Sequence, residues 1–130
     1  MDPLFLSLEE ILQIHADQIE RYGGSPGIRD LALLESAVAM PQAGMGDQYF
    51  HATLYEMAAA YLFHIVQNHP FVDGNKRVGA TAAFVFLKLN GLTVSASEPE
   101  FERMVRQVAE GGFGKDQIAA FFKKNSRKLR

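Results

Sequence analysis

The chain has 130 residues, of which 48% are hydrophobic and none is cysteine, and its formal net charge is −2. This length and apolar content predict one folded domain over residues 1–130 rather than a disordered chain. The lack of cysteine excludes disulfides, a thiol nucleophile and cysteine-ligated metals, and the small net charge argues against a direct nucleic-acid partner. The amino terminus lacks the features of a secretory signal, and no stretch is long and apolar enough to span a bilayer. We therefore expect a cytoplasmic protein without a membrane partner.

The first third of the chain predicts two helices and a flap. Residues 7–10 (Ser-Leu-Glu-Glu) match a capping box, and apolar residues follow at helical spacing. The Gly- and Pro-rich segment 23–27 ends this helix. A second helix is expected over residues 30–40. Residues 41–52 contain Gly and Pro without a sustained period, and they predict a surface flap or short hairpin.

Four more helices are expected in the rest of the chain. They cover residues 53–68, residues 75–89, residues 97–110 and a segment that begins near residue 115. The helix over 75–89 is apolar on nearly every face, which is typical of a helix in the middle of a bundle. The predicted fold class is therefore all-α, a compact bundle of about six helices.

Charge is distributed unevenly along the sequence. Residues 1–70 hold nine acidic and two basic residues, whereas residues 71–130 hold six acidic and eleven basic residues. Five of these bases lie in the last eight residues, 123–130. We interpret this tail as a solvated, frayed helix end, where cations suit the helix dipole. The alternative is a docking patch for an acidic partner.

The segment 69–77, which reads His-Pro-Phe-Val-Asp-Gly-Asn-Lys-Arg, combines a polar loop over 69–74 with the first residues of the most apolar helix. Pro70 disfavours helix at His69, and the ring of Phe71 can anchor the loop in the core. A loop held between two buried helices is a rigid mounting for reactive groups. This segment is the candidate functional site.

The start of the following helix predicts an anion site. The backbone N–H groups of Gly74, Asn75, Lys76 and Arg77 lie where a helix has unpaired donors and the positive end of its dipole. The side chains of Lys76 and Arg77 add positive charge, and Arg grips phosphate with a fork of donors. A phosphate chain is the anion most consistent with this pattern.

Two other residues of the loop suit phosphoryl transfer. Asp73 is negative and does not suit a phosphate, but it suits Mg²⁺, which bridges carboxylate and phosphate oxygens. His69 suits a general base, because imidazoles change charge near neutral pH. The structural alternatives are that His69 only closes a helix, that Asp73 or Asn75 only caps the next one, and that Asp-Gly is only a hairpin turn.

The segment resembles the core motif of the Fic/Doc superfamily, H-x-F-x-(D/E)-G-N-(G/K)-R. The matching residues are His69, Phe71, Asp73, Gly74, Asn75, Lys76 and Arg77. Residues 22–30 and 33–37 also resemble the Doc branch, so the resemblance covers most of the chain. Fic adenylyltransferases usually carry Gly where this chain has Lys76, and a second Arg where it has Ala80.

The resemblance implies a Fic/Doc-like fold and a death-on-curing toxin. Such a toxin transfers the γ-phosphate of ATP to a Ser or Thr hydroxyl of a translation protein, elongation factor Tu, and arrests translation. It also implies His69 as the base, Asp73 as the Mg²⁺ ligand and residues 74–77 as the phosphate cradle. A Lys side chain on this cradle fills space that Gly leaves open. We therefore expect the nucleotide to bind in the opposite direction to that in Fic adenylyltransferases, with the γ-phosphate and not the α-phosphate at His69.

Two other functions stay open at this point. One is Fic-type adenylyl transfer to a protein hydroxyl, and the other is a catalytically silent module that binds nucleotide or a partner. The inhibitory motif of many Fic proteins, [S/T]-x-x-x-E-[G/N], is absent from the sequence. The resemblance therefore implies a separate antitoxin, whose disordered tail folds as a helix in a groove on the toxin.

The remaining histidines are given structural interpretations. His15 lies on the apolar stripe of the first helix and is expected to be partly buried. His51 lies in the flap, as a surface residue or as part of the entrance to the site. His64 is five residues from His69, which is the wrong spacing for two zinc ligands on one helix face.

Overall fold

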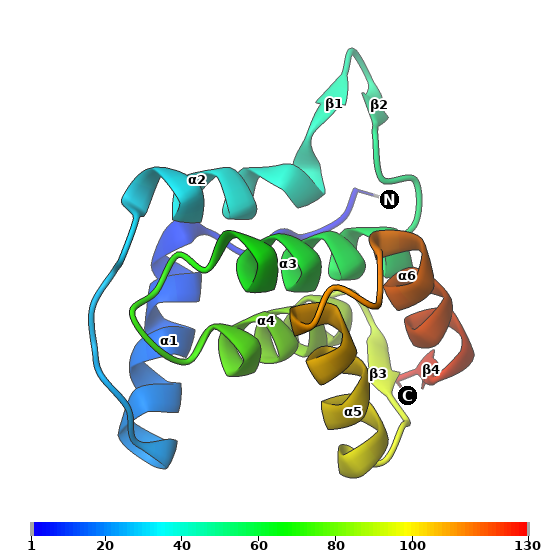
Figure 1. Cartoon of the computed structure of the whole chain (residues 1–130). Coiled ribbons are helices and arrows are strands. Elements are labelled where there is room, and N and C mark those ends of the chain that lie inside the picture. The colour runs from blue at the N-terminus through cyan, green and yellow to red at the C-terminus, as the bar shows by residue number, and fades with distance from the viewer. Residues whose placement is uncertain (1, 130) are drawn as a thin grey trace.

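The computed structural model describes residues 2–129 and contains six helices. These are α1 (Leu8–Tyr22), α2 (Leu31–Ala39), α3 (Leu54–Asn68), α4 (Asn75–Leu89), α5 (Glu98–Ala109) and α6 (Lys115–Lys124). The expected all-α bundle is therefore confirmed. In Figure 1, α3 and α4 run side by side through the middle, between α1 and α2 on one side and α5 and α6 on the other. Within the described residues, no helix is long and apolar enough to cross a membrane.

Polar side chains fix the predicted helix starts. Ser7 and Glu10 form the expected capping box at α1, and Asp30 accepts a hydrogen bond from the N–H of Leu33 at α2. Thr53 caps α3, and Ser97 with its acidic partner one turn later forms a second capping box at α5. Each cap satisfies backbone donors that a helix leaves unpaired.

The flap is a short hairpin. A 3-10 turn, η1 (Met40–Gln42), leads from α2 into β1 (Gly44–Met45), which pairs antiparallel with β2 (Gln48–Tyr49). The side chains of both strands are exposed, and the hairpin projects from the body of the bundle (Figure 1). The expectation for residues 41–52 is confirmed.

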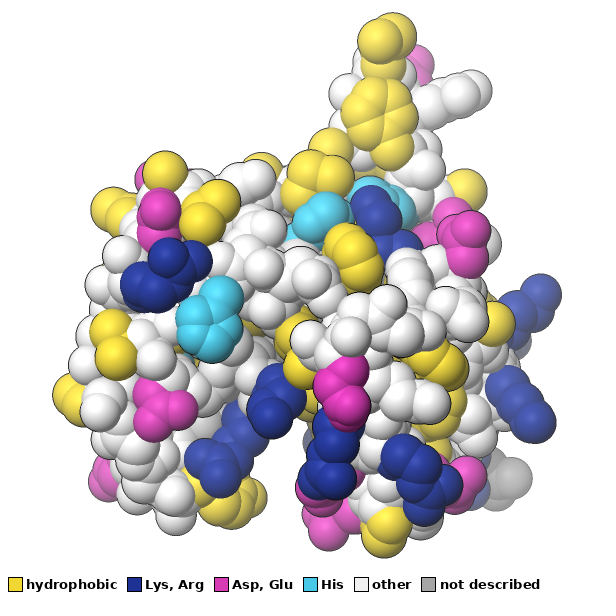
Figure 2. All heavy atoms as spheres, in the orientation of Figure 1, with side chains coloured by type: hydrophobic (Ala, Val, Ile, Leu, Met, Phe, Trp, Pro, Cys, Tyr) yellow, Lys and Arg dark blue, Asp and Glu magenta, His cyan; other side chains and the backbone are white. Residues whose placement is uncertain are grey.

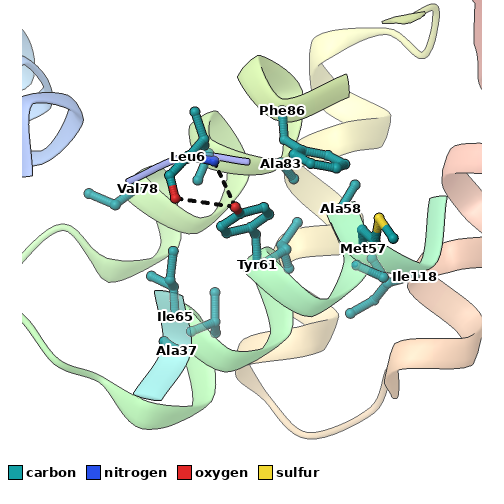
Figure 3. Close-up of a cluster of buried hydrophobic side chains, with 14 of the residues drawn as sticks. Leu6, Ala37, Met57, Ala58, Tyr61, Ile65, Val78, Ala83, Phe86 and Ile118 are labelled. Carbon is teal, nitrogen blue, oxygen red and sulfur yellow. Dashed lines mark hydrogen bonds between the residues drawn. The ribbon is translucent and has the colours of Figure 1, made fainter. Parts of the chain in front are cut away.

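The core lies along the contact between α3 and α4. Small residues let the two backbones approach closely, because a side chain on Gly79 would meet the carbonyl oxygen of Leu62 at 3.2 Å. The fully buried Tyr61 lies at the centre of the cluster in Figure 3. Its hydroxyl accepts a hydrogen bond from the N–H of Leu6 and donates to the carbonyl of Leu6. Burial raises the pKa of Tyr61 to about 12, so the hydroxyl keeps the proton that it donates.

One face of α4 is less buried than expected for a helix in the middle of the bundle. Phe84 and Thr81 on this helix are only half-buried, and they line a groove instead of packing against another helix. The hydropathy of the sequence predicted burial on all sides, whereas the chain leaves this apolar face partly uncovered.

The interpretation of the basic tail as a helix end is correct only for Lys123 and Lys124, which lie in the last turn of α6, because a strand follows them. Helix α6 ends at Lys124, where the side chain of Asn125 donates to the carbonyl of Phe121. Residues Ser126–Lys128 then form β4, which pairs antiparallel with β3 (Leu92–Val94). This pairing is a long-range contact that local charge does not reveal. Arg130 lies outside the described residues.

A lysine and two histidines join the flap, α3 and α6. The ammonium of Lys115 lies 3.2 Å from Nε2 of His64 and 3.4 Å from Nε2 of His51. Burial and the charge of Lys115 lower the pKa of His64 to about 4 and also lower the pKa of His51. His51 thus lies against Lys115 and His64 and not beside His69. The neutral imidazoles are the form that can accept hydrogen bonds from the ammonium.

The lowered pKa of His64 predicts that acid destabilises the fold. The pKa of His64 is about 6.5 in the unfolded chain and about 4 in the folded protein. Between these two pH values, His64 binds a proton in the unfolded chain but not in the folded protein. The free energy of unfolding should therefore fall as the pH drops through this window. Because the side chain is only half-buried, screening by solvent limits the loss to about 1–2 kcal/mol.

Urea denaturation of the parent and of His64→Gln at several pH values checks this. The variant should lose less stability than the parent between pH 6.5 and pH 4, because Gln does not titrate. Equal losses in the two proteins would contradict it.

Candidate active site

His69 ends α3 in a left-handed conformation, with φ 50° and ψ 52°. It is the one non-glycine residue with positive φ among residues 2–129. This conformation costs a residue with a side chain roughly 1–2 kcal/mol, so Gly or Asn usually occupies such a position. Unfavourable backbone conformations of this kind cluster at functional sites, so the structure makes His69 a candidate functional residue.

Asn75 fixes the direction of the imidazole. Its side-chain nitrogen lies 3.2 Å from Nδ1 of His69 and donates to the carbonyl of Phe71 at 3.0 Å. Its side-chain oxygen accepts from the N–H of Phe71 at 2.9 Å. Because Phe71 holds both ends of this buried amide, the contact with His69 has a set direction. The sequence predicted Asn75 only as part of the phosphate cradle or as a helix cap.

The middle of the loop rests on α1. The ring of buried His15 stacks on the ring of Phe71, with centroids 3.9 Å apart and planes at 7°. Its Nε2 lies 3.0 Å from the carbonyl oxygen of Asp73, which can only accept, so this nitrogen donates. The structural interpretation of His15 is confirmed.

The carboxylate of Asp73 binds the segment between α1 and α2. One oxygen accepts from the N–H of Gly74 at 2.9 Å, and the other accepts from the N–H of Ser25 at 3.2 Å. A side chain on Gly24 would meet the second oxygen at 2.7 Å, so only Gly fits there. The N–H of Gly74 is consequently engaged, which differs from the expectation of four free donors.

All six predicted site residues line one cavity of about 440 Å³. They are His69, Asp73, Gly74, Asn75, Lys76 and Arg77. The first turn of α4 opens into this cavity, and its N–H groups have no acceptor within the helix. Together with the side chains of Lys76 and Arg77, these donors make the α4 wall of the cavity positive.

A second cavity of about 640 Å³ adjoins the first and lies between α1, α4, β3 and α5. Lys76 and Arg77 line both cavities, and the guanidinium of Arg77 lies 4.9 Å from the ring centre of Tyr22. The lining of this second cavity, a groove, includes the aromatic side chains of Phe84 and Phe101. Figure 2 shows the surface hollowed between α1 and α5, with Lys and Arg on both sides. Periodicity and motif spacing do not predict where this groove lies, because its walls come from distant segments of the chain.

The segment between α1 and α2 contributes residues to the site for which the sequence analysis proposed no role. Residues 22–30 resembled the Doc branch, and the structure places Ser25 on Asp73 and Arg29 on the end of α3. Their exposed backbone and lack of periodicity gave no physical signal, so only the family resemblance marked them.

The chain is similar to known proteins over most of its length. The sequence model of the Fic/DOC family matches residues 5–87, which include every residue of the candidate site. The chain is 39% identical over 101 residues to "Toxin Doc" of Mycolicibacterium smegmatis, which covers 76% of this chain and 78% of that protein. It is 33% identical over 114 residues to "Protein kinase doc" of Escherichia phage P1, which covers 88% and 89% of the two chains.

The clash at Gly24 predicts an interaction between this residue and Asp73. Gly24→Ala should displace the carboxylate from the N–H of Ser25, so the amide of Ser25 should exchange hydrogen faster. Gly23→Ala is the matched control, because Gly23 also has positive φ but a side chain there meets nothing within 4 Å.

A double-mutant cycle measures the coupling. In an Asp73→Ala background, Gly24→Ala should cost about 1 kcal/mol less stability than in the parent, because the clashing carboxylate is gone. Additive losses in the cycle would refute the proposed contact.

Proposed function

Because the chain belongs to the Fic/DOC family, we propose that it is a Doc-type toxin that transfers the γ-phosphate of ATP to a Ser or Thr hydroxyl of a protein. The observation that carries the proposal is the shared cavity, which the imidazole of His69 and the cationic start of α4 line together. The relative named "Protein kinase doc" supports phosphate as the transferred group. The relative named "Toxin Doc" supports the biological role.

Each group in the cavity has a part in this reaction. His69 takes the proton from the attacking hydroxyl, and Asn75 keeps its ring directed at the cavity. The first turn of α4, with Arg77, binds the phosphates and stabilises the charge that develops on them. The protein thus supplies positioning and electrostatic stabilisation, which are the main needs of phosphoryl transfer.

Asp73 fits a Mg²⁺ ion bound together with ATP. Each of its oxygens accepts one backbone N–H, which leaves lone pairs for a cation, and its side chain is exposed in the cavity. Mg²⁺ keeps several waters and commonly takes only one or two protein carboxylates besides phosphate oxygens. The ion would neutralise part of the phosphate charge.

Lys76 and Ala80 favour γ-phosphate transfer over adenylyl transfer. Lys76 adds bulk and charge at the first turn of α4, where the Fic pattern has Gly. Ala80 lines the adjoining groove at the position where that pattern has a second Arg. Without this Arg, the groove has one cation fewer to bind a nucleotide in the adenylylating orientation.

We extend the proposal to the target, the partner and the location. By resemblance to the Doc branch, the substrate is elongation factor Tu, and its modification arrests translation in the cytoplasm. The groove beside Lys76 and Arg77 is the proposed site for the antitoxin. Its aromatic lining suits the apolar face of an amphipathic helix, and its glutamates and arginines suit the polar edges.

Mass spectrometry of the modified target tests the reaction. A gain of one phosphate supports the proposal, a gain of AMP supports adenylyl transfer, and an unmodified target with growth arrest supports a silent binding module. His69→Ala should lower kcat by about 10²–10⁴-fold, because the base acts on the chemical step.

The affinity of His69→Ala for ATP should stay within about twofold of the parent, since the phosphates bind at α4. Isothermal titration measures it. If ATP affinity fell as far as kcat, His69 would be a binding contact and not the base.

Lys76→Gly tests why this residue occupies the cradle. The variant should produce some AMP-modified target, because the space that a Gly leaves lets the nucleotide bind in the other direction. Lys76→Arg is the matched control and should still transfer phosphate, since it keeps both bulk and charge. An unchanged product from Lys76→Gly would show that the side chain does not set the orientation.

A further inference from the structure

We propose that Arg29 is a positioning residue for His69, and this inference rests on the proposed function. Arg29 lies in the segment between α1 and α2, outside the 69–77 motif and outside the residues that line the cavity around His69. It acts through the backbone of the α3 end and not on the substrate.

Arg29 binds three consecutive carbonyl groups around His69. Its Nε donates to the carbonyl of His69 at 2.6 Å, and its Nη2 donates to the carbonyl of Asn68 at 2.8 Å. Its own backbone N–H donates to the carbonyl of Pro70 at 2.7 Å, which the N–H of Asp30 also approaches at 3.0 Å. One residue therefore fixes the peptide planes at His69 and on both sides of it.

The rest of this segment keeps Arg29 in register with the loop. Ile28 and Phe71 form an antiparallel bridge, and the N–H of Val72 donates to the carbonyl of Gly27 at 3.1 Å. In Figure 1 the connection from α1 to α2 runs beside the loop between α3 and α4. The guanidinium thus approaches the end of α3 from a backbone that is itself bonded to the loop.

These contacts stabilise the unfavourable left-handed backbone of His69. The last carbonyls of a helix lack intrahelical partners, and a cation there meets the negative end of the dipole. A planar guanidinium donates two parallel hydrogen bonds in a fixed fork, which the single nitrogen of Lys cannot reproduce. The backbone N–H of His69 donates to the carbonyl of Ile65 at 3.2 Å, and its carbonyl is bound by this fork, so the fork holds the left-handed residue from its carbonyl side.

The alternative is that Arg29 only stabilises the helix end. A merely stabilising residue would lower the melting temperature without a selective effect on the chemical step. A positioning residue changes kcat while ATP affinity stays constant, because the phosphate cradle belongs to α4. The two roles are therefore separable in the folded protein.

The experiment compares Arg29→Ala, Arg29→Lys and Arg21→Ala in the full chain. Arg21 is the matched control, since it pairs with Asp17 on an exposed face of α1. Arg29→Ala should lower kcat by about 10–100-fold, as expected for a misplaced reacting group, with ATP affinity within about twofold of the parent. The kcat of Arg29→Lys should lie between the values for the parent and for Arg29→Ala. The kcat of Arg21→Ala should equal that of the parent.

Chemical rescue separates position from general damage. Guanidinium ion at about 10 mM, well below denaturing concentrations, can occupy the vacated fork and should restore kcat of Arg29→Ala several-fold. It should not change Arg21→Ala. An unchanged kcat in folded Arg29→Ala would overturn the proposal, and so would a loss that guanidinium does not restore.

A second readout needs no reaction. In spectra of protein with isotope-labelled histidine, the ring resonances of His69 should shift in Arg29→Ala and return with guanidinium, while those of His64 stay fixed. If the parent transfers neither phosphate nor AMP, the proposed function fails, but these spectra still test the placement of His69. If the resonances do not move while the parent transfers phosphate, the inference about Arg29 fails alone. Should Arg29→Ala not fold, Arg29→Lys carries both readouts.

Discussion

The close packing of α3 against α4 is the constraint on which the site depends. Gly79 lets α4 approach the backbone of Leu62, and the buried side chains of both helices lock their relative position. The loop between them is short, so two rigid helix ends determine where its residues lie. A backbone in a sparsely populated conformation persists only where its surroundings hold it, as they do at His69.

Local chemistry made most of the fold predictable. Capping residues such as Ser7, Thr53 and Ser97 mark helix starts, because their hydrogen bonds stay within one turn. The apolar periodicity that follows each of them predicts the buried face of the helix. The tail at Ser126–Lys128 was not predictable in this way. Its strand exists only because β3 lies beside it, and neither charge nor periodicity encodes a partner that distant in sequence.

The candidate site shows the same division between local and distant information. The motif placed His69, Asp73 and the start of α4 together because they are neighbours in sequence, and one cavity holds them. It did not reveal that the side chain of Asn75 contacts His69, nor that Asp73 engages the N–H of Gly74. These contacts depend on side-chain directions that spacing along the chain leaves open.

The segment between α1 and α2 belongs to the site as much as the motif does. Ser25 binds the carboxylate at one end of the loop, and Arg29 binds the carbonyls at the other end. The next residue, Asp30, caps α2, which continues through η1 into the flap. The segment that carries Arg29 thus holds the backbone carbonyls of Asn68 and His69 from outside the motif, and it leads directly into the first turn of α2.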